Sequence, residues 1–152
     1  MRKSLKSLLL IIITSLSSYF GYADIVDPAV IVSHIDIHKD NVISEIENRK
    51  SEKIYLKAGN EKFGLNHILK KHSRNFFPDY RQKGNLFPEL TNGKQIIKGI
   101  ENVYRNGHDN PKAYGNKKVL QHTIHLNGKN DTYRLVINED NEVITFFRLR
   151  KS

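Results

Sequence analysis

The 152-residue chain contains no cysteine, which excludes disulfides, a thiolate nucleophile and cysteine-based metal sites. Its net charge of +9 is unevenly distributed along the sequence. Residues 24–61 hold eight acidic and five basic residues, whereas residues 62–152 hold eight acidic and seventeen basic residues. Five of the seven histidines also lie in the second segment. A concentrated positive field attracts polyanions, so the second segment favours nucleic acid as a partner; a merely soluble basic surface or attraction to anionic lipid is the alternative.

The first 23 residues have the layout of a secretory signal peptide. Three basic residues precede an apolar run from Leu8 to Leu16, and the small residues Gly21 and Ala23 follow it. The run is shorter than the roughly 20 residues of an ordinary membrane span. We expect cleavage near Ala23, a secreted or periplasmic mature protein and no stable membrane insertion after cleavage, with an uncleaved anchor as the alternative.

Residues 24–53 predict a helical segment ahead of a main domain at residues 54–152. Pro28 suits the first turn of one helix. The segment predicts one or two helices, the second from the short apolar stripe of Val42, Ile43 and Ile46.

Two histidines in this segment have the spacing of a metal site. His34 and His38 are i, i+4 and would share one face of a helix. No third ligand accompanies them, so we interpret both as surface residues and expect no metal ion and no cofactor.

The stretch FGLNHILKKH, residues 63–72, predicts a helix behind a glycine and after a short strand near Ile54. Leu65, Ile68, Leu69 and His72 fall on one helical face, which places His72 toward the surface on which the helix packs. His67 falls on a different face, toward solvent or the rim. A satisfied core histidine is the structural alternative for His72.

Residues 73–92 predict an irregular loop rich in aromatic and basic residues, a length that is often functional in a compact domain. Its aromatic residues either stack on bases or, as we favour, pack the loop onto the core. A second amphipathic helix follows, capped by Thr91 or Asn92 and ending at Gly107. A polar loop precedes the strands.

The last third predicts three antiparallel strands, at residues 118–126, 132–138 and 142–150, with a hairpin at Asn127-Gly128. The expected fold class is α+β: N-terminal helices followed by an antiparallel meander, joined by the strand near Ile54, with the helices packed on one face.

The register of the last hairpin has two solutions. A two-residue turn at residues 139–140 places Arg134 opposite Thr145, whereas a three-residue loop with Asn141 left-handed pairs Arg134 with Phe146. Turn chemistry slightly favours the second.

The order of these elements resembles the barnase/EndoU/colicin/RelE-like (BECR) nuclease superfamily of bacterial polymorphic toxins. The shared features are a glycine-led helix with HILKKH, a loop, a second amphipathic helix and a terminal meander whose last strand contains ITFF. The resemblance covers about residues 54–150. It implies a BECR-like fold and a metal-independent endoribonuclease, with RNA as the substrate, tRNA among its candidates, and a cognate inhibitor or immunity protein as a further partner. The catalytic residues that it implies are His67, His72, Arg134 and Thr145.

The chemistry expected of these residues is attack by the ribose 2′-hydroxyl to give a 2′,3′-cyclic phosphate. We assign His72 as the base, His67 as the acid or phosphate donor, and Arg134 as the phosphate clamp, with the two histidine roles interchangeable. Thr145 would orient the phosphate or the 2′-hydroxyl. Lys70, Lys71 and Arg148 are the candidate substrate-binding residues.

Two functions of other classes compete with this one. The first is a non-catalytic secreted domain that binds nucleic acid, acidic glycan or a membrane surface through its basic charge. The second is an envelope structural protein. Neither requires His72 for an activity.

Overall fold

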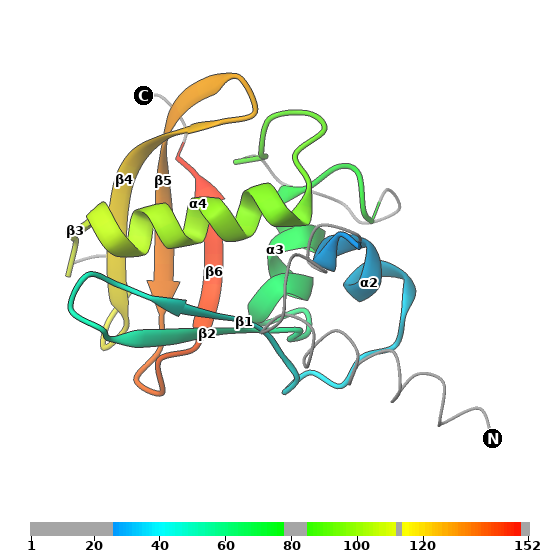
Figure 1. The fold of residues 1–152 in the computed structure, drawn as a ribbon, viewed down its shortest axis with the longest axis horizontal. Helices are drawn as coiled ribbons and strands as arrows, with labels where there is room; N and C mark the ends of the chain where they lie inside the picture. The colour runs from blue at the N-terminus through cyan, green and yellow to red at the C-terminus, as the bar shows by residue number, and fades with distance from the viewer. Residues whose placement is uncertain (1–25, 78–84, 112–113, 150–152) are drawn as a thin grey trace.

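The computed structural model describes residues 26–77, 85–111 and 114–149. These residues form an α+β fold, as the sequence predicts, and the expected leader lies outside them. None of the helices in these ranges is long and apolar enough to cross a membrane. The elements, in chain order, are α2 (Pro28–His34), β1 (Val42–Glu47), β2 (Lys53–Lys57), α3 (Gly64–His72), α4 (Gly93–Asn106), β3 (His108–Asp109), β4 (Lys118–Leu126), β5 (Lys129–Ile137) and β6 (Val143–Arg148) (Figure 1).

The larger sheet is antiparallel, with the strand order β3-β4-β5-β6. The predicted hairpin between β4 and β5 is confirmed: Asn127 and Gly128 adopt φ of 44° and 80°, and Leu126 pairs with Lys129. Two successive positive φ angles match the twist of the flanking strands. The sequence did not predict β3, which pairs with β4 within the expected polar loop.

The predicted second N-terminal helix is wrong. Residues 42–47 form β1, which pairs antiparallel with β2 in a separate two-stranded sheet. The β-branched residues Val42, Ile43 and Ile46 suit a strand, and the partner strand supplies the ladder of backbone hydrogen bonds that a helix would have made internally. This hairpin spans the predicted boundary between residues 53 and 54.

The strand near Ile54 was expected to join the meander, and this expectation is also wrong. It pairs with β1 instead, and the two sheets meet through an isolated parallel bridge between Tyr55 and Glu142. Lys57 forms an ion pair with Glu142 at the same place. The β1–β2 hairpin is therefore attached to the turn between β5 and β6.

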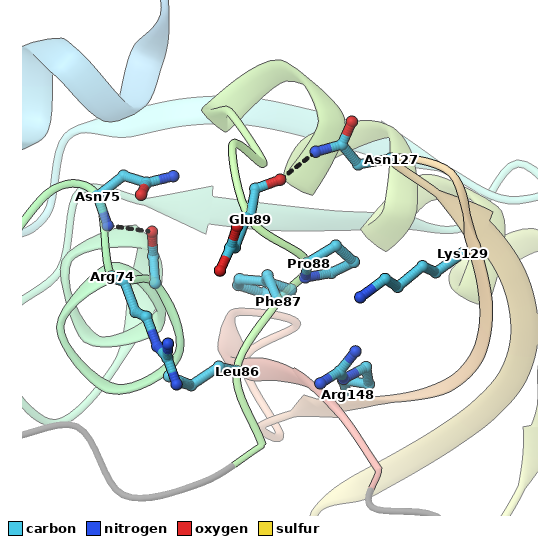
Figure 2. A pocket seen from close by; sticks show the side chains of 10 residues that line it. Arg74, Asn75, Leu86, Phe87, Pro88, Glu89, Asn127, Lys129 and Arg148 are labelled. Atoms are coloured by element: carbon cyan, nitrogen blue, oxygen red, sulfur yellow. Dashed lines mark hydrogen bonds between the residues drawn. The ribbon is translucent and has the colours of Figure 1, made fainter.

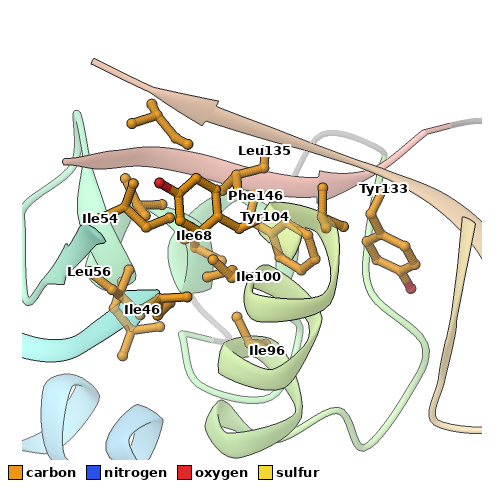
Figure 3. Close-up of a cluster of buried hydrophobic side chains, with 14 of the residues drawn as sticks. Ile46, Ile54, Leu56, Ile68, Ile96, Ile100, Tyr104, Tyr133, Leu135 and Phe146 are labelled. Atoms are coloured by element: carbon orange, nitrogen blue, oxygen red, sulfur yellow. The ribbon is translucent and has the colours of Figure 1, made fainter. Parts of the chain in front are cut away.

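A single hydrophobic cluster joins both sheets and the helices (Figure 3). Helix α4 crosses the larger sheet (Figure 1) with Ile96, Ile100 and Val103 fully buried. A Cβ on Gly99 would lie 3.0 Å from Cζ of Phe146. A glycine at this position therefore lets the helix approach the sheet closely.

The helix starts are fixed by side-chain and backbone constraints. Asp27 caps two helices at once, since its carboxylate accepts hydrogen bonds from the backbone N–H of Ala29 and of Gly93, both at 3.0 Å. Of the two predicted caps of α4, Thr91 and Asn92, the structure has Asn92, which forms a capping box with Gln95.

The glycine that leads α3 is required by its backbone. Gly64 has a φ of +77°, and a Cβ there would lie 2.7 Å from the carbonyl oxygen of Lys57. From this start α3 runs alongside β6, the edge strand of the larger sheet (Figure 1). Its last carbonyl, that of His72, accepts a hydrogen bond from the N–H of Phe87 at 2.9 Å.

The register of the last hairpin differs from both predicted solutions. Asn141 is left-handed, with a φ of 60°, as the three-residue loop requires. The register then shifts between Val136 and Ile137, which leaves Ile144 as an extra residue in β6. As a result Arg134 pairs with Phe147, and Thr145 pairs with Val136.

Candidate active site

His72 lies at the last position of α3 and is packed against β6. Its ring stacks on that of Phe147 with the centroids 5.2 Å apart, and its Nε2 lies 3.5 Å from Oγ1 of Thr145. On another side the ring of Phe87 meets it edge-on at 6.3 Å. The prediction that His72 points toward the packed side of the helix is thus confirmed.

The surroundings of His72 hold it neutral. Burial, the nearby His67 and the charge of Lys71 lower its pKa to about 4, against a raising effect of the backbone of Asn85. Within the described residues, no group meets its Nδ1 at hydrogen-bonding geometry although that atom is buried. At pH 7 the imidazole is therefore in its neutral form, the form that can accept a proton.

His67 faces His72 across the end of α3. Their rings meet edge-on with centroids 6.1 Å apart. Nδ1 of His67 lies 2.7 Å from the carbonyl oxygen of Glu61, which can only accept, so Nδ1 carries the proton and Nε2 is the basic atom. Burial first, and then the charge of Lys71, lower the pKa of His67.

Arg134 extends from β5 over the same ring that His72 contacts. Its Cζ lies 6.0 Å from the centroid of Phe147 and 5.7 Å from that of Tyr114. In the amide orientation that satisfies both polar atoms of Gln121, the oxygen accepts hydrogen bonds from Nε of Arg134 at 2.8 Å and from Nδ2 of Asn110 at 3.0 Å. The guanidinium is therefore positioned by a neutral amide.

The charge of Arg134 has no carboxylate partner among the described residues, in contrast to Arg148 and Lys57, which form ion pairs. Strand alternation places Arg134 and Thr145 on one face of the sheet, with one residue pair of the ladder between them. Through Phe147, the guanidinium and the His72 imidazole belong to one cluster of side chains.

The three predicted substrate-binding residues do not lie together in the structure. Lys70 and Lys71 lie on α3; Lys70 contacts Glu61 at 3.5 Å and lies over the ring of Phe77. Lys71 acts on both histidines through its charge. Arg148 follows Phe147 in β6, so it points to the opposite face, where its Nη1 lies 3.3 Å from Oδ2 of Asp131.

The loop aromatics that the structure describes pack as we favoured. Phe87 is 7% exposed and stacks on Tyr133 and Phe146, while Phe76 and Phe77 pack partly buried against the core. The remaining loop candidates, Tyr80, Arg81 and Lys83, lie outside the described residues.

His34 and His38 are exposed, as expected, but they do not share a helix, because α2 ends at His34. Within the ranges that the structure describes, no three His, Asp or Glu side chains are grouped so as to hold a metal ion.

Sequence reasoning missed Gln121 and Phe147. The position of Gln121 was readable, because a two-residue Asn127-Gly128 turn puts it opposite Arg134. The position of Phe147 was not, since it depends on the extra residue Ile144 in β6.

No protein-family model matches the chain, and a search of curated proteins returned no relative.

Proposed function

We propose that this protein is a secreted, toxin-like endoribonuclease of the BECR type, which cleaves RNA without a metal ion by attack of the ribose 2′-hydroxyl. The observation that carries the proposal is the placement of His72. A neutral imidazole, stacked on Phe147 and beside the hydroxyl of Thr145, lies near a second imidazole. The guanidinium of Arg134 lies over the same Phe147 ring, and no carboxylate among the described residues pairs with it. The resemblance of residues 54–150 to that superfamily agrees with it.

In this mechanism His72 takes the proton from the 2′-hydroxyl, and the oxygen attacks the adjacent phosphorus. His67 donates a proton to the 5′-oxygen that leaves, and the products are a 2′,3′-cyclic phosphate and a 5′-hydroxyl. The hydrogen bond to the backbone of Glu61 acts on the pKa of His67 against the lowering by burial, which is why we assign the proton donor to this ring. A bound phosphate raises the pKa of both rings, because an anion favours the charged imidazole.

Arg134 stabilises the additional negative charge that develops on the phosphate. Gln121 orients the guanidinium through a neutral amide, so this contact leaves its positive charge available for a phosphate. Thr145 orients Nε2 of His72 or the 2′-hydroxyl, and Lys71 adds positive charge near both histidines.

The decisive test is to incubate the purified protein with total RNA in the presence of EDTA and to analyse the ends of the products. We expect cleavage with 2′,3′-cyclic phosphate ends. Salt-sensitive RNA binding without cleavage would instead select the non-catalytic binding domain. Cleavage that EDTA abolishes would contradict the metal-independent mechanism.

A further inference from the structure

A cavity of about 400 Å³ lies beside the end of α3, next to the cluster that His72 forms with Phe147 and Arg134. Its walls come from the segment after α3, the segment before α4, the tip of the β4–β5 hairpin and the end of β6 (Figure 2). Phe87 lines the cavity and also contacts the ring of His72 at 6.3 Å. One aromatic side chain therefore belongs to both sites.

Three cations line this cavity against one carboxylate, that of Glu89. Figure 2 shows Lys129 and Arg148 reaching toward the cavity from the sheet, with Arg74 on the wall across from them. Arg148 pairs with Asp131, but within the described ranges neither Arg74 nor Lys129 forms an ion pair. The cavity therefore has an excess of positive charge, which attracts an anion.

The rest of the lining is suited to more than a bare anion. Leu86 and Pro88 contribute apolar surface, and Asn75 and Asn127 contribute amides. The side chain of Asn127 donates a hydrogen bond to the carbonyl oxygen of Glu89, which ties the hairpin tip to the opposite wall (Figure 2). Cations, amides and an apolar wall around one partly open cavity match the phosphate, base edges and base face of a nucleotide.

We propose that this cavity is the subsite for a nucleotide of the RNA next to the two nucleotides that the scissile bond joins. The inference rests on the proposed ribonuclease function. Arg74 and Lys129 bind the phosphate of that nucleotide, and the base lies against Leu86 and Pro88. Because Phe87 lines the cavity and also contacts the ring of His72, a nucleotide bound here lies within one side chain of the candidate base.

Binding is tested first, with the whole protein and without catalysis. Adenosine 5′-monophosphate, inorganic phosphate and adenosine are each titrated while the side-chain amide NMR signals of Asn75 and Asn127, which both line the cavity, are followed. We expect the nucleotide to bind more tightly than either fragment, and the double variant Arg74→Ala/Lys129→Ala to weaken its binding by about tenfold or more. Both cations are exposed, so the fold should be retained; Lys98→Ala, an exposed lysine of α4, is the matched control.

Cleavage then tests the subsite. The double variant should lower kcat/KM for a tetranucleotide by about tenfold and leave that for a dinucleotide unchanged, because only the longer strand reaches the cavity. Equal nucleotide binding by the parent and the double variant, or binding of phosphate alone as tight as that of the nucleotide, would overturn the inference. If the parent and the double variant cleave the tetranucleotide equally well, the subsite alone is overturned. If the protein binds the nucleotide but cleaves no RNA, the proposed function and the subsite are both contradicted.

Discussion

The imidazole of His72 stacks on the ring of Phe147 with 5.2 Å between centroids and 23° between planes. This contact joins the end of α3 to the edge strand β6 and fixes the plane of an imidazole that would otherwise rotate. Arg134 approaches the same ring from the neighbouring strand. Phe147 is therefore the common support of the candidate base and the candidate phosphate clamp.

We expect His72→Ala and Arg134→Ala each to reduce RNA cleavage by about 10²-fold or more, the usual scale for losing a positioned acid–base group or charge stabiliser. Cleavage of a defined RNA is measured together with thermal unfolding, because His72 is packed against the core. His38→Ala is the matched control, since this histidine is exposed and lies apart from the cluster. Folded variants that cleave like the parent would refute the constellation.

The stability of the protein should depend on the protonation of His72. Its pKa in the folded state is lowered to about 4, so between that value and the ordinary 6.5 the unfolded chain binds more protons at this site. The stabilising contribution is present above pH 6.5 and is lost as the pH falls through about 4. Urea unfolding at pH 7 and pH 4.5 should show a greater loss for the parent than for His72→Phe, by on the order of 1–2 kcal/mol. Equal losses would contradict the lowered pKa.

The same titration should appear in the activity. If neutral His72 is the base, kcat/KM of the parent should fall on the acid side of neutrality with an apparent pKa well below 6.5, which belongs to the His67–His72 pair rather than to one ring. A pH–rate profile with the RNA below saturation measures it. If the apparent pKa of the acid limb lies at or above 6.5, the catalytic base is not a histidine with a lowered pKa.

Asp27→Ala should destabilise the fold by roughly 1–3 kcal/mol, because one carboxylate caps both α2 and α4. Chemical denaturation of the parent and the variant measures the free energy of unfolding. Asp36→Ala, which removes an exposed carboxylate, is the control. A variant as stable as the parent would mean that water replaces both hydrogen bonds at little cost.

We expect the leader to be removed after Ala23 when the protein is exported. The expectation rests on the order of basic, apolar and small residues in 1–23. Mass spectrometry of the exported protein decides it. A mature species that retains the apolar run from Leu8 to Leu16 would contradict the prediction.

The sequence by itself determined the elements whose pattern is local. The glycine before α3, the capping box of α4 and the Asn127-Gly128 turn each specify their backbone through the residues present, and the helical period placed His72 on the packed face of α3. It also determined the charge and the absence of thiol chemistry. These properties depend on neighbours within a few positions or on composition alone.

Only the tertiary structure decided which distant residues meet. Residues 42–47 have an apolar pattern compatible with a short helix. They form a strand instead, because their backbone pairs with β2. The extra residue Ile144 moved Arg134 opposite Phe147, and alternation along β6 then sent Arg148 to the other face. One residue inserted into a strand thus separated the candidate clamp from the cation that lines the neighbouring cavity, because register is set by pairing between strands and not by either strand alone.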